Sequence, residues 1–583
     1  MLHTLSRSLR ENKGPALVTV LLSALEVVFE IVIPLFMSNL IDFGIEGGSM
    51  AAVWKFGAFL LLLAAFQLAT GVLAARIAAR ASVGFAANLR EDMFDNVQTF
   101  AFSNIDKFST ASIVTRLTTD TTNVQNAFQM LMRMAIRAPV MLIFSMIVSF
   151  RISHDISMTF LIILPILALA LFFIIRSVFP VFSRVFRTYD ELNNVVQENV
   201  RGIRVVKSFN QERHEIGKFG AISERIYKDF SKGERLITLN APLMQFCIYT
   251  CMIVISWLGA KAIIASGNDP ALGLTTGNLT ALITYTMQIL SSLMMLSMVF
   301  AMLTISLSSA RRIAEVLEER SDIPQPEQPV MTVRDGAVDF DHVSFVYASK
   351  ADKKVLDDID LHIRSGETIG IIGGTGASKS SLVQLIPRLY DVTGGKLTLG
   401  GVDVRDYDLD TLRGAVAMVL QKNELFSGTI AENLRWGNEN ATDEQLRHAC
   451  ELACADGFIS AMPDGYDTHI EQGGTNVSGG QKQRLCIARA LLKKPKVLIL
   501  DDSTSAVDTR TDAQIQQALS TYIPDTTKII IAQRISSVQN ADRIVVLDDG
   551  RIDAVGSHDE LLRTCEIYRE VYESQQKGGE DDA

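Results

Sequence analysis

The chain has 583 residues, of which 48% are hydrophobic and 21% are charged, and its mean hydropathy is +0.22. This length exceeds one ordinary domain, and this composition excludes a disordered chain, a fibre and a wholly soluble protein. Asp and Glu (65) outnumber Lys and Arg (55), so the net charge of −10 excludes the basic surface typical of nucleic-acid-binding proteins. We therefore expect an apolar membrane part joined to a polar part.

The first residues, 1–14, are polar and include Arg7, Arg10 and Lys13. The apolar run behind them meets no small-residue cleavage site before Asp42, so we expect a retained membrane span and not a signal peptide. The six cysteines form neither Cys-x-x-Cys pairs nor a secreted framework, which favours a reducing cytosol or a bilayer.

Six stretches are apolar enough to cross a bilayer as helices, for which about 20 residues are needed. Loops 42–54 and 266–279 contain no Lys or Arg, whereas 76–137 and 176–235 contain many, as does the N-terminus. This bias predicts that both termini are cytosolic, with Arg151 as an exception in a short turn. The two long cytosolic loops contain few Pro or Gly residues, which predicts helices that continue beyond the membrane. The predicted spans are 16–41, 56–75, 138–150 with its upstream turn, 156–179, 239–264 and 281–306.

Two carboxylates, Glu26 and Glu30, lie inside the first span on one helical face. A charge at this depth is costly and faces a bundle interior, a partner helix or a wet cavity. Two interpretations stay open: the pair is solvated or bound to a neighbouring helix, or it lines a cavity that favours cationic cargo.

Four methionines in the sixth span form one stripe, at spacings of seven, four and four. Methionine is flexible and repacks around varied shapes, so the stripe is either a helix-packing face or a wall for cargo. The four are Met287, Met294, Met298 and Met302.

Composition changes sharply in residues 318–334, where Pro324, Pro326 and Pro329 prevent a helix. We place the domain boundary here, with a membrane domain over 1–320, a linker over 321–336 and a soluble domain over 337–583. Short apolar runs then alternate with amphipathic helices, which is typical of an α/β fold.

A strand-like run at 367–372 leads into a loop of small residues and then a helix. Backbone N–H groups of such a loop surround phosphate oxygens, while Lys379 adds a positive charge and Ser380 offers a hydroxyl to Mg²⁺. One position departs from the pattern, because Ser378 stands where glycine is expected. We still expect nucleotide binding. The loop comprises Gly373, Gly374, Thr375, Gly376, Ala377, Ser378, Lys379, Ser380 and Ser381.

A buried strand at 497–500 ends in Asp501 and Asp502. In phosphate-loop proteins the first acid at such a strand end holds Mg²⁺, often through water, and the second would polarise the attacking water.

A second anion site is predicted at Ser478, Gly479, Gly480 and Gln481, which open the helix-like run 482–492. One nucleotide does not need both sites. The economical interpretation is that this site faces the nucleotide of another subunit.

Taken in order, these motifs closely resemble the ATP-binding cassette (ABC) family over nearly the whole chain. Six spans followed by one cassette resemble an exporter half-transporter: a membrane all-α six-helix domain, then an α/β phosphate-loop nucleotide-binding domain. The resemblance implies ATP and Mg²⁺ as cofactors, with Tyr347 stacking on adenine and Gln421 bridging Mg²⁺ to the membrane part. It also implies that 477–481 is the family signature and that Asp508 ends a loop, 505–508, that crosses the dimer.

The same resemblance implies short coupling helices near 103–108 and 210–219, through which the long loops would contact the cassettes. Two positions depart from the family's hydrolytic sites, because Asp502 replaces a glutamate and Gln533 replaces the switch histidine. The shorter side chain withdraws its carboxylate by roughly 1 Å, a misplacement that can cost about 100-fold in rate. Glutamine can hydrogen-bond a phosphate but carries no titratable proton.

These departures weaken one site and leave the signature nearly intact, which predicts a heterodimer whose efficient site is built on the partner's motifs. A homodimer with two slow sites and an ATP-gated regulator or channel stay as alternatives. A peptide-processing exporter is not expected, because fourteen residues before the first span leave no room for a protease. We expect a bacterial inner-membrane protein that exports lipophilic or drug-like small molecules, with the bilayer and a second half-transporter as partners.

Overall fold

The computed structural model describes residues 1–270, 273–347, 354–374, 376–503 and 507–580. It forms two compact units. The membrane unit comprises Met1–Gln98 and Thr110–Glu319, and the cassette unit comprises Thr99–Ser109 and Arg320–Ala583. The short segment Thr99–Ser109, although it lies between two membrane helices in sequence, thus packs with the cassette unit.

The membrane unit contains six helical segments long and apolar enough to span a bilayer, one for each predicted span, among its described residues. Short helices α1 (Leu2–Arg7), η1 (Arg10–Asn12) and α8 (Ile203–Ser208) accompany them. The segments are α2 (Lys13–Asn39) with η2 (Leu40–Glu46); α3 (Met50–Gln98); α5 (Thr110–Thr115) with η3 (Arg116–Asp120) and α6 (Thr121–Ile152); α7 (His154–Arg201); α9 (Glu212–Thr238) with α10 (Asn240–Ser266); and α11 (Thr276–Glu318).

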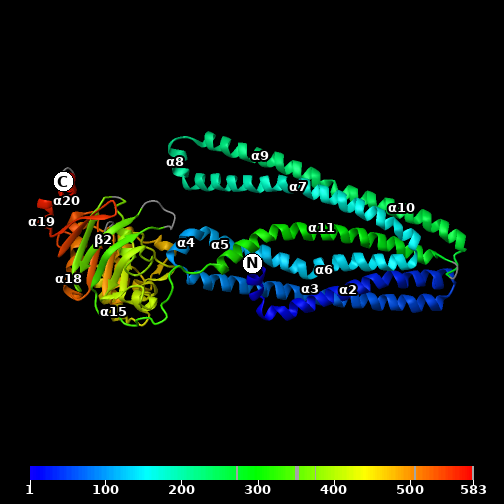
Figure 1. Ribbon diagram of the computed structural model, residues 1–583, viewed down its shortest axis with the longest axis horizontal. Helices are drawn as coiled ribbons and strands as arrows, with labels where there is room; N and C mark the ends of the chain where they lie inside the picture. Colours follow the sequence, from blue (N-terminus) through cyan, green and yellow to red (C-terminus); the bar gives the residue numbers. More distant parts are fainter. Residues whose placement is uncertain (271–272, 348–353, 375, 504–506, 581–583) are drawn as a thin grey trace. The chain divides into compact units, whose positions relative to one another are not determined.

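Helices α3 and α7 have 49 and 48 residues, a length of about 70 Å at 1.5 Å per residue. A hydrocarbon core of about 30 Å covers less than half of that. The prediction that the spans continue as helices beyond the membrane therefore agrees with the fold. Figure 1 shows α7 pairing with α9 and α10 in one long hairpin, with α8 at its tip, and α2, α3, α6 and α11 running side by side.

The cassette unit is built on a six-stranded sheet of order β12-β11-β3-β10-β9-β6, in which only β12 runs antiparallel to its neighbour. Every residue of β9 is buried, as expected for a strand covered on both faces. An antiparallel sheet of order β2-β1-β4-β5 completes the core. The strands of the main sheet are β3 (Thr368–Gly373), β6 (Val416–Val419), β9 (Val497–Asp501), β10 (Thr527–Ile531), β11 (Arg543–Asp548) and β12 (Arg551–Gly556); those of the second are β1 (Val338–Phe345), β2 (Leu356–Ile363), β4 (Gly394–Leu399) and β5 (Val402–Asp403).

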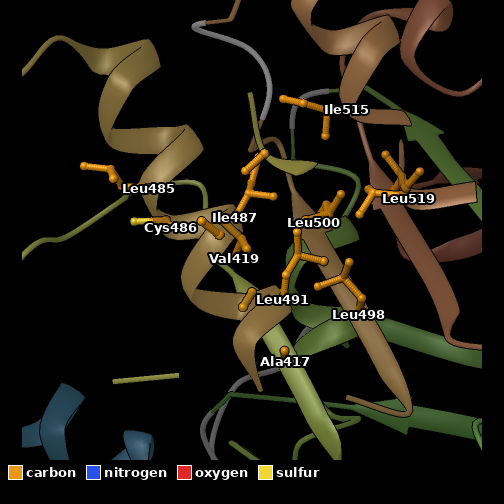
Figure 2. Close-up of a cluster of buried hydrophobic side chains, with 14 of the residues drawn as sticks. Ala417, Val419, Leu485, Cys486, Ile487, Leu491, Leu498, Leu500, Ile515 and Leu519 are labelled. Carbon is orange, nitrogen blue, oxygen red and sulfur yellow. The ribbon is translucent and has the colours of Figure 1, made fainter. Parts of the chain in front are cut away.

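Helices cover the main sheet and bury one side of it. Figure 2 shows α17 (Gly479–Leu492) directing Ile487 and Leu491 toward Val419 of β6 and Leu500 of β9, with Ile515 of α18 (Thr509–Tyr522) close by. This packing anchors α17 along its length and so fixes the position of its N-terminus. The remaining helices of the unit are α4 (Phe102–Phe108), α12 (Lys379–Gln384), α13 (Leu409–Ala415), α14 (Ile430–Arg435), α15 (Asp443–Leu452), α16 (Asp456–Ser460), α19 (His558–Thr564) and α20 (Glu566–Glu580).

The predicted fold class is confirmed, since six apolar helical segments precede an α/β unit with a parallel central sheet.

Candidate functional site

The candidate nucleotide site lies where four parallel strands end. The phosphate loop follows β3, Gln421 follows β6, Asp501 ends β9 and Gln533 follows β10. Because the carboxyl ends of parallel strands lie at one edge of a sheet, segments far apart in sequence meet there. The sheet order places the three loops after β3, β10 and β9 next to one another.

Glycine is required in the phosphate loop at two positions for different reasons. A Cβ at Gly373 would lie 2.2 Å from the backbone oxygen of Leu547 on the adjacent strand β11, so no larger residue fits there. Gly376 has a φ of +87°, which side chains rarely adopt. The Lys379 ammonium donates to the backbone oxygens of Gly373 and Gly374 at 2.8 and 2.9 Å. Burial lowers the pKa of Lys379, and Asp501 and Asp502 oppose this shift.

Ser378, the departure from the phosphate-loop pattern, has a φ of +66° and immediately precedes α12. This left-handed conformation explains why glycine is expected here, because a side chain at such a φ costs on the order of 1 kcal/mol. The loop thus keeps the glycine conformation with a serine in it.

Replacing Ser378 by glycine should therefore stabilise the loop. We expect Ser378→Gly to raise the unfolding free energy by about 0.5–1 kcal/mol and to tighten ATP binding by a few-fold, because strain is relieved where the loop must curl. Thermal unfolding of the full-length protein, with and without ATP, measures both effects. Ser381→Gly, at the third residue of α12, is the control and should destabilise. A Ser378→Gly protein less stable than wild type contradicts the prediction.

A carboxylate and a hydroxyl suited to Mg²⁺ meet beside this loop. Asp501 is buried, forms no ion pair with any described residue, and accepts a hydrogen bond from the Ser380 hydroxyl. Burial, reinforced by Asp502, raises the pKa of Asp501. These two hard oxygen ligands beside the phosphate loop fit a magnesium ion, which prefers few protein ligands plus substrate phosphates.

The second carboxylate, Asp502, is held by side-chain amides from two other loops. Its Oδ2 accepts from Nε2 of Gln533 at 2.8 Å and from Nε2 of Gln421 at 3.3 Å, and its φ is +48°. Burial raises the pKa of Asp502, while the two glutamine hydrogen bonds lower it. The structure therefore brings together three predicted site residues that are 81 and 31 positions apart in sequence.

The Gln533 loop is braced by a residue that sequence reasoning missed. Gln575 of α20 donates from Nε2 to the backbone oxygen of Gln533 at 2.7 Å and accepts at Oε1 from the backbone N–H of Ile535 at 2.9 Å. No local signal distinguishes Gln575 from its neighbour Gln576, because only the fold brings α20 to this loop.

The second predicted anion site lies at the N-terminus of α17. Ser478 caps this helix in a capping box, accepting from the Gln481 N–H at 3.3 Å while Gln481 Oε1 accepts from the Ser478 N–H at 2.9 Å. Ser478 and Gly479 are exposed, and Gly480 is partly exposed. Among the described residues their side-chain hydrogen bonds stay at the start of α17 and do not reach the phosphate loop, so this surface remains available to a ligand outside this chain's own site.

Other predicted residues lie at the edges of these two sites. Ala377 is buried beside Gly373, and Asp508 caps α18 by accepting from the Thr511 N–H at 2.9 Å. Thr375 and the first part of the 505–508 loop lie outside the described residues.

Comparisons with known proteins identify the family. A model of the ABC transporter transmembrane region matches residues 16–294, and a model described as ABC transporter matches residues 356–505. An uncharacterized ABC transporter ATP-binding protein of Bacillus subtilis, YfiB, is 35% identical over 558 residues, 96% of each chain. Another of Mycobacterium tuberculosis, Rv1273c, is 33% identical over 580 residues, 99% of this chain and 98% of that one. This chain belongs to the ABC transporter family.

The fold of this ABC transporter is similar to that of a solved bacterial Atm1-family ABC exporter with ATP bound. The TM-score is 0.79 at 24% identity, over 97% of this chain and 98% of that one. One transmembrane region followed by one cassette makes the chain a multi-pass ABC half-transporter with an ATPase domain, and its fold is that of an ABC exporter.

Two further predicted elements of this ABC transporter can be placed. Tyr347 is 44% exposed, and its hydroxyl lies 2.7 Å from the Ser381 Oγ at the start of α12. The first predicted coupling helix corresponds to α4, which packs with the cassette unit. The second, near 210–219, falls at the turn from α8 to α9 in the membrane unit, where Phe209 and Ile216 are 71% and 70% exposed.

The structure also places the carboxylates and the methionine stripe of the membrane unit. Glu26 and Glu30 both pair with Arg137 of α6, which agrees with binding to a neighbouring helix, and Glu30 also lines a cavity. Met287, Met294 and Met298 are 46%, 39% and 62% exposed, so the stripe is not a packing face within the described residues of this chain.

Proposed function

We propose that this ABC transporter is one half of a heterodimeric exporter of lipophilic small molecules. In this assembly it holds Mg²⁺-ATP at a weakly hydrolytic site, and its signature motif, residues 477–481, completes the partner's efficient site. The observation that carries the proposal is the state of Asp502: a short carboxylate, buried and hydrogen-bonded by the amides of Gln421 and Gln533. A base in this position must reach and polarise an attacking water. The Asp502 carboxylate is one methylene shorter than that of glutamate and already accepts two hydrogen bonds, so it reaches the water poorly.

The other residues of the site bind rather than cleave. The phosphate loop and Lys379 would hold the phosphates, Ser380 and Asp501 would hold Mg²⁺, and Tyr347 would stack on adenine. Magnesium neutralises phosphate charge when bound. Gln533 can donate a hydrogen bond to a γ-phosphate but cannot exchange a proton with it. Together these groups retain ATP and cleave it slowly.

The exposed signature supports the second half of the proposal. Gly479 and Gly480 offer N–H groups at the N-terminus of a well-anchored 14-residue helix, the arrangement that favours phosphate. Phe209 and Ile216, exposed at the α8–α9 turn, fit a contact with a second subunit, because burying them there removes apolar surface from water. We place both termini in the cytosol, on the basis of the loop charges, and the protein in a bacterial inner membrane.

The test is vanadate-sensitive ATPase activity of the purified full-length chain, alone and combined with its partner half-transporter. We expect activity in the mixture to exceed that of this chain alone by at least about 100-fold, the cost of a base misplaced by about 1 Å. Equal activity of this chain alone would overturn the heterodimer in favour of a homodimer. ATP-dependent accumulation of a lipophilic dye in inside-out vesicles tests export, and nucleotide binding without accumulation would favour a gated channel.

A further inference from the structure

An ion triad lies inside the membrane unit. The Arg137 guanidinium of α6 donates to Glu26 Oε1 at 2.7 Å and to Glu30 Oε2 at 2.6 Å, both on α2. Glu30 lies 14 residues into the predicted first span, about 20 Å from its start. Two carboxylates share one guanidinium, so the triad carries a net charge of −1 when both carboxylates are ionised.

The two carboxylates have different surroundings. Glu26 is buried against α3, where a Cβ at Gly71 would lie 3.2 Å from its Oε1. Glu30 instead lines a cavity of about 170 Å³, together with Arg137. Its second oxygen, Oε1, has no hydrogen-bond donor among the described residues. The net negative charge therefore has a free acceptor at the cavity wall.

The rest of the cavity wall is soft and apolar, with a few small hydroxyls. Met141 of α6 and Met287 and Met295 of α11 line it. Gln288 is not free to adapt, because its Oε1 accepts from Ser145 at 3.1 Å and its Nε2 donates to the Glu30 backbone oxygen at 3.2 Å. Methionine walls fit apolar groups of varied shape.

The size of the cavity limits what can bind. Pockets for whole drug-sized ligands are about 300–1,000 Å³, so 170 Å³ accommodates a head group only. From Met287 the stripe continues along α11 to the exposed Met294 and Met298, which offers a surface for an attached apolar chain.

We propose that this cavity binds the cationic head group of an amphiphile, such as a quaternary ammonium, beside Glu30, with its apolar chain along the Met294–Met298 stripe. The inference rests on the proposed export function and names its substrate class. A cation is favoured over an anion because the triad's net charge is negative and its one guanidinium is already occupied by two carboxylates.

Binding is measured first, without ATP, on the full-length assembly in nanodiscs of zwitterionic lipid. The probes are radiolabelled decyltrimethylammonium and decyl sulfate, which share a chain and differ in charge. We expect wild type to prefer the cation, and Glu30→Gln to weaken cation binding by about tenfold or more while leaving the anion unchanged, because the amide keeps the Arg137 contact and removes the charge. Glu46→Gln, the same change on an exposed residue outside the cavity, should bind like wild type.

A second variant covers the case in which Glu30→Gln does not fold. Ser291 is exposed and lines the cavity, so Ser291→Lys places a positive charge there without replacing any residue of the triad. We expect it to abolish the preference for the cation. Unchanged cation binding in either folded variant, or tighter binding of decyl sulfate by wild type, would overturn the inference.

ATP-dependent uptake of the same cation into inside-out vesicles separates this inference from the proposed function. Glu30-dependent binding without ATP-driven uptake would uphold the site and refute export. ATP-driven uptake that Glu30→Gln and Ser291→Lys leave unchanged would uphold export and refute the site.

Discussion

Gly480→Asp in this chain should reduce the ATPase activity of the proposed heterodimer by about 100-fold or more. Gly480 is the second residue of α17, close to the N–H groups proposed to face the partner's nucleotide. A carboxylate there repels a γ-phosphate, and two unit charges about 4 Å apart interact by about 4 kcal/mol at an effective dielectric of 20. The variant should still fold, because an acidic residue in the first turn favours the helix. ATP hydrolysis by the purified assembly at saturating ATP gives the measurement.

Two matched variants make this result specific. Gly480→Asn has the same shape without the charge and should retain most of the activity. Asp502→Asn, at the site built on this chain's own motifs, keeps an oxygen that can accept from Gln533. It should change total hydrolysis by less than about twofold, since the proposal places the efficient site on the partner. A large loss in Asp502→Asn, with little effect of Gly480→Asp, contradicts the proposed division between the two sites.

Tyr390→Ala should reduce transport by more than about tenfold while the assembly still binds ATP. Tyr390 lies between the proposed adenine site and α4: its ring centroid is 5.1 Å from that of Tyr347 and 6.0 Å from that of Phe102. Its hydroxyl donates to Asp106 Oδ2 at 2.9 Å. Burial, together with Asp106, raises the pKa of Tyr390, so the phenol remains a donor at physiological pH.

These contacts make Tyr390 a positioning residue between the proposed nucleotide site and α4, the predicted coupling helix. Aromatic pairs contribute about 0.5–1.5 kcal/mol each beyond the effect of the area they bury, and a hydrogen bond to a charged group contributes about 1.5–3 kcal/mol. The alanine variant therefore loses several kcal/mol of the interaction between the Tyr390 segment and α4. Molecules exported per ATP hydrolysed is the quantity to measure. Tyr390→Phe keeps the rings and loses the hydrogen bond, so it should show an intermediate ratio; a ratio equal to wild type in Tyr390→Ala excludes this role.

Much of the domain organisation of the chain could be predicted, because the sequence patterns that indicate it are formed by adjacent residues. A span is a run of apolar residues, and a phosphate loop is nine adjacent residues between a strand and a helix. The departures at Ser378 and Asp502 were visible for the same reason. Their conformations were not: φ values of +66° and +48° depend on how the flanking strand and helix meet.

By itself the sequence determined the six spans, the α/β cassette with its phosphate loop, and the motifs that indicate the ABC family. Only the tertiary structure decided which residues meet: Arg137 with Glu26 and Glu30, Gln575 with the Gln533 loop, and Tyr390 with Asp106. These partners are between 42 and 284 positions apart. Hydrophobic periodicity fixes which face of an element is buried, but the packing of whole elements decides which partner each polar side chain contacts.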